Sequence, residues 1–225
     1  EIQQMLSVIP EPAATIFAVA AFTGLRRSEL QGLRWEDYRD GQIQVSRAIW
    51  QGHESDPKTG RSKGAVPVIK QLAERLEFHR LRTGNPENGP MFHNSRKKPV
   101  CLNNVLGRQI LPALKRCAHC GKSEGEHAKA THNFKLDENF PKWHGWHAAR
   151  RGLGSNLYAL GVPEKVIQQI LRHANVATTN TYYIKTASDQ VTSAMEKLQQ
   201  ALPQSLCGNE VATQSWNATA TPVVN

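Results

Sequence analysis

The most constraining feature of the sequence is an apolar stretch over residues 13–22, which contains no charged side chain. The pair Thr23 and Gly24 that follows is typical of the end of a helix. A membrane-spanning helix needs about 18 or more apolar residues, so this stretch is too short to cross a bilayer. Apolar residues around the whole circumference of a short helix predict that it is buried inside a packed domain.

Apolar spacing predicts further helices on both sides of a short β region. Residues 42–46 alternate polar and apolar side chains, which is typical of a half-buried strand, and Val66 and Val68 lie on a second strand. Turn residues at 37–41 and 53–64 border these strands. The expected helices cover about residues 25–33, 69–81, 102–117 (with a kink or break at Pro112), 147–160, 163–172, 176–183 and 187–202. The predicted fold class is therefore mainly α with a small antiparallel β-sheet (α+β).

The length of 225 residues fits one large domain with appendages. We expect this domain to cover residues 1–202, with a polar Cys/His-rich insertion at about 117–141 and a flexible tail at 203–225. The first residues lack the basic and apolar regions of a signal peptide. We therefore expect a cytoplasmic protein with no membrane contact.

The charge balance favours a polyanionic partner. The 28 Lys and Arg residues exceed the 19 Asp and Glu residues and give a formal net charge of +9. Such an excess is typical of proteins that bind nucleic acid. Many basic proteins bind no nucleic acid, so the charge alone does not decide the function.

Two short patterns combine residues that suit phosphate chemistry. His147 and Arg150 are three positions apart, which places them on one face of a helix, where the guanidinium suits phosphate oxygens and the imidazole can move protons. Arg26 opens a helix after the buried one, and Glu29 is placed to hold it. The alternatives are a solvated basic helix face for the first pair and a surface ion pair of little energy for the second.

A third pattern places Tyr182 and Tyr183 after His173, with a turn and a helix between them. A phenol has a pKa of about 10, so it needs cationic neighbours to act as a nucleophile. The alternative is that both tyrosines simply pack in the core.

In this order and spacing, the three patterns resemble the tyrosine recombinase (phage integrase) family. Residues 23–33 resemble its first arginine box, residues 147–161 its H-x-x-R box and residues 171–183 the box that ends in its tyrosine nucleophile. The resemblance covers about residues 10–190 and is interrupted by residues 118–141. It implies the catalytic-domain fold of a site-specific DNA recombinase or integrase, an enzyme that breaks and rejoins DNA.

The resemblance implies roles for individual side chains. The implied catalytic residues are Arg26, Lys58, His147, Arg150, His173 and Tyr182, with Glu29 supporting the first arginine. Tyr182 lies nine residues after His173, which is the family's spacing for the nucleophile, and Tyr183 is the alternative. Lys58 best matches a lysine that the family carries in a β-hairpin turn, and Lys63 is the alternative.

Four neighbouring positions bear on this assignment. Counting back from Gly161 favours His147 and Arg150 over His144 and Arg151, and Arg27 is interpreted as structural. Arg172 stands where the family usually has Gly, which either adds a phosphate contact or only changes the turn.

The resemblance also implies a mechanism and partners. The two arginines would clamp the phosphate oxygens, Tyr182 would form a 3′-phosphotyrosyl bond, and Lys58 would protonate the leaving 5′-oxygen. His147 would take or orient the tyrosine proton and His173 would bind a phosphate oxygen, with no ATP, catalytic metal or other cofactor. Double-stranded DNA is the implied substrate, bound by a synaptic tetramer in which residues 187–202 dock on a neighbour. The alternative for residues 187–202 is a helix that packs on its own domain. Accessory DNA-bending proteins are possible partners.

The family's full-length proteins carry an N-terminal DNA-clamping domain, to which nothing in this chain corresponds. We therefore expect the catalytic domain of a longer protein, associated with the nucleoid when bound to DNA. Its source is expected to be bacterial or phage-borne.

The insertion has its own candidate chemistry. Cys117 and Cys120 form a C-x-x-C pair, and His127 and His132 complete a set of ligands suited to tetrahedral zinc. Competing ligands are His119 and His144. The set predicts a structural zinc site without a part in catalysis, and the alternative is a reduced polar loop that holds no metal.

Three other functions remain open from the sequence. A type IB topoisomerase-like enzyme would use the same strand cleavage without exchange. A DNA-binding relative would keep the fold but not the chemistry, and a zinc-dependent interaction module would work through residues 118–141.

Overall fold

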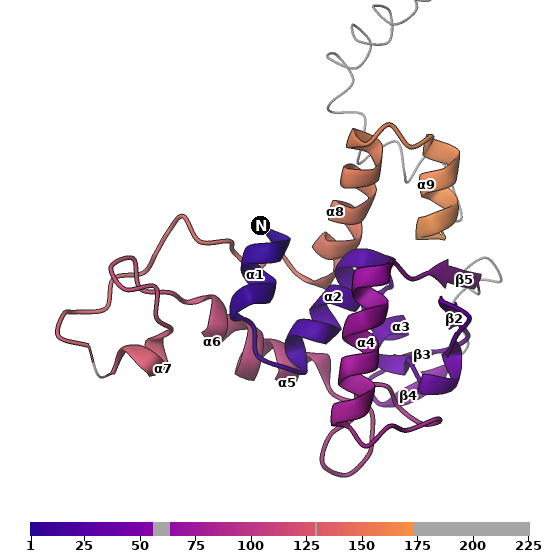
Figure 1. Ribbon diagram of the computed structural model, residues 1–225, viewed down its shortest axis with the longest axis horizontal. Coiled ribbons are helices and arrows are strands. Elements are labelled where there is room, and N and C mark those ends of the chain that lie inside the picture. Colours follow the sequence, from indigo (N-terminus) through magenta and orange to yellow (C-terminus); the bar gives the residue numbers. More distant parts are fainter. Residues whose placement is uncertain (56–63, 129, 173–225) are drawn as a thin grey trace, which may run out of the picture. The chain divides into compact units, whose positions relative to one another are not determined.

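The computed structural model describes residues 1–55, 64–128 and 130–172 (Figure 1). The predicted helices at 176–183 and 187–202 and the tail lie outside the described residues. Within them, no helix combines the length and the apolar content needed to cross a bilayer. The helices of the first half are α1 (Ile2–Val8), α2 (Ala13–Thr23), α3 (Arg27–Gly32), the short 3-10 helix η1 (Trp35–Asp37) and α4 (Lys70–Arg82). The second half contains α5 (Leu102–Val105), η3 (Leu106–Ile110), α6 (Leu111–Leu114), α7 (Glu124–His127), α8 (Trp146–Ala159) and α9 (Glu164–Leu171).

The predicted buried helix is α2, and it is the centre of the main hydrophobic core. Nearly every residue from Ala13 to Thr23 is buried. Gly24 ends the helix in the left-handed conformation at φ 62°, as the Thr-Gly pair predicted. The core around α2 includes Leu76 of α4, Ile110 of η3 and Trp146 of α8. A helix without a polar face is stable only when other elements surround it and shield its apolar side chains from water.

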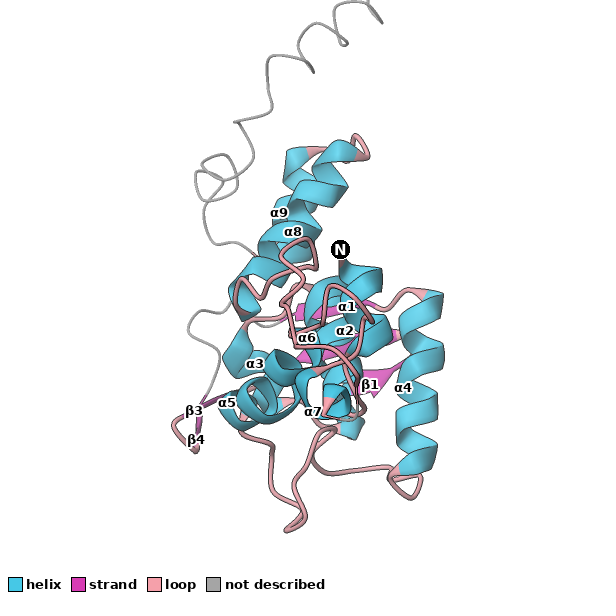
Figure 2. Ribbon diagram, turned by 90° about the vertical axis from the view of Figure 1, so that its left-hand side faces the viewer, coloured by secondary structure: helices cyan, strands magenta, loops and turns pink. Residues whose placement is uncertain are grey.

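The β region is more elaborate than expected. The strands are β1 (Tyr38–Arg39), β2 (Gln42–Val45), β3 (Ala48–Trp50), β4 (His53–Ser55) and β5 (Gly64–Pro67). The three-stranded antiparallel sheet has the order β1-β2-β5, with Ile43 opposite Val66, and both of these side chains are buried. The predicted turns at 37–41 and 53–64 therefore contain β1 and β4, and β3 pairs with β4 in a separate hairpin. Both views show α4 beside the three-stranded sheet (Figures 1 and 2).

The helix expected over 102–117 is interrupted in the way that Pro112 suggested. It consists of α5 and α6 joined by a π-helical stretch at Leu106–Ile110. Proline cannot donate the hydrogen bond to the fourth residue before it, and a π-helical turn is one way in which a helix accommodates that loss. The segment ends at Leu114, earlier than predicted, so Cys117 lies in the insertion.

Helices α8 and α9 form a smaller second cluster. Ile167 and Leu171 of α9 are fully buried against Leu153 and Leu157 of α8. The two helices lie side by side in both ribbon views (Figures 1 and 2). This pairing brings the C-terminal end of α9 to the side chains that α8 carries.

Candidate active site

Arg26 is fixed at the start of α3 by the carboxylate of Glu29. The backbone N–H of Arg26 donates to Glu29 Oε2 at 2.9 Å, and its Nη1 donates to Oε1 at 2.6 Å. Glu29 is 2% exposed, whereas the Arg26 side chain remains 35% exposed. The alternative of a surface ion pair is therefore wrong, because Glu29 lies inside the protein and holds a partly accessible guanidinium.

A second arginine shares the same carboxylate. Arg172 Nη2 donates to Glu29 Oε2 at 2.9 Å, and Arg172 is itself buried. Arg172 ends α9 in the left-handed conformation at φ 52°, a region that favours glycine. Arg172 thus occupies a turn position that favours glycine, and its side chain supplies a buried partner for Glu29. The family resemblance indicated that an arginine at position 172 is unusual, but it did not predict the ion pair with Glu29.

The charge of Glu29 is stabilised by both arginines. Burial alone raises the pKa of the Glu29 carboxyl, but the guanidinium of Arg172 and the hydrogen bonds from Arg26 outweigh it and hold the pKa below its ordinary value. Glu29 is therefore ionised at neutral pH and keeps both arginines in place.

Arg150 reaches the same region from α8. It is 2% exposed, and its Nη1 donates to the carbonyl oxygen of Gly24 at 2.5 Å. Its Nη2 donates to the carbonyl oxygen of Leu171. The side chain therefore links the end of α2 to the end of α9, and the alternative of a solvated basic face is wrong for Arg150.

The two predicted clamp arginines converge on consecutive carbonyl groups. Arg26 Nη2 lies 3.4 Å from the carbonyl oxygen of Arg172, and Arg150 donates to that of Leu171. These groups lie at the C-terminal end of α9, directly before His173. The end of a helix presents carbonyl oxygens with partial negative charge, so it attracts guanidinium groups.

Gly24 is required where these elements meet. A Cβ atom at Gly24 would lie 2.8 Å from Leu171 Cδ2 and 3.2 Å from Leu153 Cδ2. The positive φ of this residue adds strain for any other side chain. A glycine at this point lets α8 and α9 approach the end of α2.

His147 lies one helical turn before Arg150 and is exposed. Partial burial lowers the pKa of its imidazole, and the charges of Arg150, Arg151 and Arg26 lower it further. The imidazole is therefore neutral at pH 7 and can accept a proton. The first two patterns meet in space through the contacts of Arg26 and Arg150 with the consecutive carbonyl groups at the end of α9.

Several predicted site residues lie outside the part of the chain that the structure describes, but their neighbours in sequence are described. Lys58, Lys63, His173, Tyr182 and Tyr183 lie outside the described residues. The segment with both lysines ends at Gly64, where a Cβ atom would lie 3.6 Å from Arg172 Cδ. Its flanking strands β4 and β5 pair with β3 and β2 respectively, so they do not form the simple hairpin that was expected.

The alternatives in register have other surroundings. Arg27 donates to Asn103 Oδ1 at 2.9 Å and so links α3 to α5, in keeping with a structural role. His144 lines a separate cleft with Phe17, Phe22 and Trp143. Among the described residues, the potential ligands brought together in the insertion are Cys117, Cys120, His127 and His132, and His144 is not one of them.

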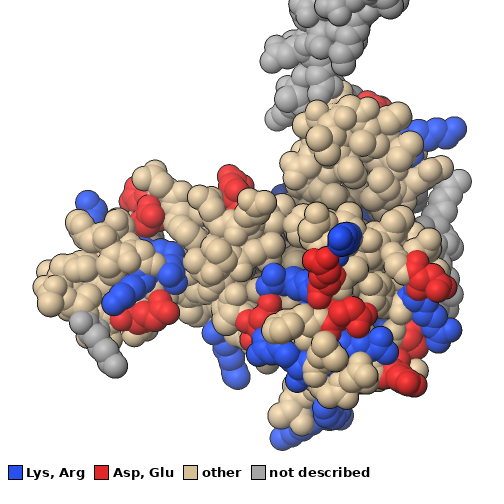
Figure 3. All heavy atoms as spheres, in the orientation of Figure 1, with Lys and Arg blue, Asp and Glu red and all other residues tan. Residues whose placement is uncertain are grey.

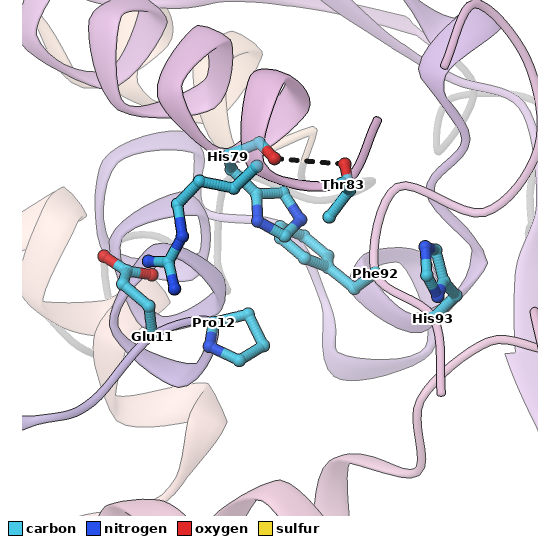
Figure 4. Close-up of a pocket in the computed structure, with 7 residues that line it drawn as sticks. Glu11, Pro12, His79, Thr83, Phe92 and His93 are labelled. Atoms are coloured by element: carbon cyan, nitrogen blue, oxygen red, sulfur yellow. Dashed lines mark hydrogen bonds between the residues drawn. The ribbon is translucent and has the colours of Figure 1, made fainter. Parts of the chain in front are cut away.

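Another histidine-containing pocket has a structural explanation. His79 and Thr83 at the end of α4 face Glu11, Pro12 and Phe92 (Figure 4). The His79 ring is buried, and its Nε2 lies 3.0 Å from the carbonyl oxygen of Met91. Burial lowers its pKa, so it is a neutral histidine of the core. None of the predicted site residues line this pocket.

Charge on the visible face is mixed. Among the described residues, Lys and Arg alternate with Asp and Glu across the face drawn in Figure 3. The excess of positive charge is therefore not gathered into one patch on this face.

Comparison with known proteins agrees with this geometry. The family described as "Phage integrase family" matches residues 1–189, and the chain belongs to this family. The chain is 28% identical over 200 residues to the "Tyrosine recombinase XerC-like" protein of Caldanaerobacter subterraneus subsp. tengcongensis. This match covers 81% of the chain and 48% of that relative, so the chain spans about half of the relative's length.

Solved structures show the same fold. The Tn1549 transposon integrase in complex with circular intermediate DNA superposes with a TM-score of 0.64 at 22% identity, covering 87% of this chain and 64% of that one. The XerA recombinase gives a TM-score of 0.53 at 20% identity, covering 80% and 55%. A lambda integrase tetramer bound to a Holliday junction gives 0.52 at 18% identity, covering 81% and 46%. The predicted catalytic-domain fold of the tyrosine recombinases is thus confirmed.

Proposed function

We propose that this chain is the catalytic domain of a site-specific DNA recombinase or integrase. The convergence of Arg26 and Arg150 on adjacent carbonyl groups, directly before His173, is the observation that carries the proposal. Membership of the phage integrase family supports it. The reaction is cleavage and rejoining of DNA strands through a 3′-phosphotyrosyl intermediate.

In the proposed reaction, Tyr182 attacks the phosphorus, and its phenolic oxygen forms the new bond. The bond to the 5′-oxygen breaks, and Lys58 protonates the leaving oxygen. His147 accepts or orients the tyrosine proton, and its lowered pKa keeps the imidazole neutral for this role. His173 binds a phosphate oxygen, and rejoining reverses the same steps, so the bond energy is conserved and no ATP is consumed.

The arginines supply the positive charge in the transition state. Guanidinium groups stay charged at any physiological pH and suit the non-bridging phosphate oxygens. Glu29 fixes Arg26, while the carbonyl groups of Gly24 and Leu171 fix Arg150. Because the second arginine is buried, we propose that the phosphate enters at the end of α9 and replaces the Leu171 carbonyl as acceptor. The chemical step then needs no divalent ion.

The relatives suggest the wider assembly. The Tn1549 integrase structure contains circular intermediate DNA, and the lambda integrase structure is a tetramer on a Holliday junction. We propose that the whole protein, including an N-terminal DNA-clamping domain, likewise acts on double-stranded DNA as a tetramer. Residues 187–202 would couple neighbouring subunits, and accessory DNA-bending proteins would assist. A cytoplasmic, nucleoid-associated protein of a bacterium or phage fits this role.

A strand-exchange assay tests the proposal against a topoisomerase. The chain is incubated with two distinguishable duplexes that carry a candidate target site, and in parallel with supercoiled plasmid. Joined hybrid strands are expected, and Tyr182→Phe should abolish them while DNA binding persists. Plasmid relaxation without hybrid strands would indicate a type IB topoisomerase-like enzyme instead. Binding without either product, on a target that the whole protein recombines, would indicate a DNA-binding relative.

A further inference from the structure

The insertion between α6 and α8 is closed at its base by backbone pairing. The N–H of Asp137 donates to the carbonyl oxygen of Arg116 at 2.8 Å, and that of Ala118 donates to Lys135 at 2.7 Å. The chain therefore enters and leaves the insertion at one place. Figure 1 shows the segment with α7 projecting from the side of the helical body.

The insertion contains little apolar material with which to hold its shape. Leu136 is 48% exposed, whereas Cys117 and His127 are the buried residues among those that the structure describes in the segment. A segment ordered by burial would show the opposite pattern, with apolar side chains inside. Its internal order must therefore come from the polar side chains at its centre.

Four of these side chains direct ligand atoms at one another. Those of Cys117, Cys120, His127 and His132 all lie within 4.8 Å of each other. Cys117 Sγ is 3.5 Å from His132 Nε2. In a tetrahedral zinc site with bonds of 2.0–2.3 Å, neighbouring ligand atoms are about 3.6 Å apart. A closure of about 1 Å would convert the widest separation into that geometry.

One ligand atom lacks any other explanation. His127 is 8% exposed, and its Nε2 is buried. This nitrogen has no hydrogen-bond partner among the described residues. A buried nitrogen without a partner destabilises the folded chain, so the free His127 nitrogen points to a ligand. The edge of Phe134 packs on the same ring, with centroids 5.2 Å apart, and helps to fix its orientation.

We infer that these four residues form a metal site that binds Zn²⁺ and holds the insertion together. Two thiolates and two neutral imidazoles give a complex with no net charge, which suits a site that is buried at Cys117 and His127 and exposed at Cys120. Soft sulfur with imidazole in a tetrahedral arrangement selects zinc over magnesium or calcium. With all four positions taken by protein, the ion is structural and has no place for a substrate.

The local structure prepares both halves of the ligand set. The N–H of Gly121 donates to the carbonyl oxygen of Cys117 at 2.8 Å, and its φ of 66° closes the C-x-x-C turn. On the other side, Ser123 and Glu126 form a capping box that begins α7, the helix that carries His127. The competing ligand His119 packs edge-on against His132 with centroids 5.4 Å apart, and belongs to the surroundings of the site.

Cobalt substitution tests this site directly. The reduced full chain is stripped of metal and titrated with Co²⁺, whose visible spectrum reports tetrahedral thiolate and imidazole coordination. We expect one Co²⁺ per chain, displaced by Zn²⁺. Cys117→Ser and His127→Asn should lose this spectrum. The matched controls Cys101→Ser and His119→Asn should keep it, because neither residue belongs to the ligand set.

Two further measurements keep the inference testable if a variant fails to fold. Cys120→His retains four ligands, so it should bind Co²⁺ with a weaker thiolate band. In the unsubstituted chain, a zinc chelator should raise hydrogen exchange of residues 116–137. An absent or octahedral spectrum, or a chelator without effect on exchange, would overturn the inference. Loss of binding in His119→Asn with retention in His132→Asn would overturn the ligand set.

Discussion

Two polar clusters in this chain obtain their order in different ways. Around Glu29, the opposing charges belong to the protein itself, and each arginine has acceptors on named backbone or side-chain groups. In the insertion, four ligand atoms face one another without an opposing charge among them, and we infer that a cation joins them. The first cluster is thus preorganised by folding alone, whereas the second, under the inference above, depends on an ion.

The two clusters should respond differently when one of their members is removed. Glu29 forms ion pairs with two arginines, so its removal breaks both pairs. Removal of one arginine leaves the other arginine paired with Glu29. In the proposed metal site, all four ligands would bind the same ion, so removal of the ion would release them together. Separate perturbation of the two clusters therefore distinguishes internal charge pairing from metal binding.

The largest effect on folding is expected from Glu29→Ala. Removal of the carboxylate leaves the buried Arg172 guanidinium without its counter-charge, which costs about 3–5 kcal/mol of the free energy of unfolding. Urea denaturation measures this loss. Glu74→Ala is the matched control, since Glu74 is exposed and only 4.0 Å from Lys70, and it should change stability by less than about 0.5 kcal/mol. Equal losses in the two variants would show that the buried pair has no special weight.

Arg150→Lys should have the largest effect on catalysis short of removing the nucleophile. Lysine keeps the charge but cannot span two carbonyl groups as the guanidinium does. We expect the rate of covalent cleavage to fall about 100- to 1000-fold. Single-turnover cleavage measures it, with the exposed Arg108→Lys as control. An unchanged rate in Arg150→Lys would remove this arginine from the proposed clamp.

Metal removal should separate the two clusters. With zinc chelated, hydrogen exchange is expected to rise in the insertion, while the amides of residues 24–30 keep their protection. The physical reason is that the Glu29 cluster contains its own counter-charges. Exchange followed by mass spectrometry measures both regions in one sample. Simultaneous loss of protection in both would contradict their independence.

A smaller effect is expected from the titration of His147. Its pKa is lowered by partial burial and three nearby arginines, so the acidic limb of the cleavage rate should lie below the ordinary histidine value of about 6.5. The unfolded chain binds this proton more readily than the folded chain. Stability should therefore decrease as the pH falls through about 6.5 and level off below the folded pKa. NMR titration of the imidazole gives the pKa, and a value above 6.5 would contradict the proposed environment.

The smallest effect should come from Arg27→Ala. Its hydrogen bond to Asn103 is exposed, and surface contacts of this kind contribute less than about 0.5 kcal/mol. Cleavage should also be unchanged, because this side chain points to α5 and not to Glu29. A strong loss of cleavage in this variant would show that the register of the first arginine box is wrong by one residue.

Much of the fold was predictable from local patterns. The apolar run over 13–22 predicted α2, and the alternation over 42–46 predicted β2, because the distribution of apolar side chains along an element follows their burial. The short strands β1, β3 and β4 were missed. His53, Glu54 and Ser55 are polar and exposed, so nothing in their sequence distinguishes a strand from a turn.

The site was predictable as residue types, but its energetics were not. The spacing of His147 and Arg150 indicated a common helix face, yet burial of Arg150 depends on α9 and Gly24, which are distant in sequence. The pairing of Arg172 with Glu29 joins residues 143 positions apart, and no local pattern reports it. The four potential metal ligands that the structure brings together were predictable as a set because their spacing in the insertion is short and characteristic, and metal binding itself stays a prediction.

The most direct test of the central claim is covalent capture on nicked DNA in EDTA. Duplexes that cover candidate target sites are incubated with the unsubstituted chain, Tyr182→Phe and Tyr183→Phe. We predict a protease-sensitive adduct at the DNA 3′ end with the unsubstituted chain and with Tyr183→Phe, and none with Tyr182→Phe. An adduct that persists in Tyr182→Phe and disappears in Tyr183→Phe would move the nucleophile by one residue. An adduct that forms only with added Mg²⁺ would contradict catalysis by the arginine cluster alone.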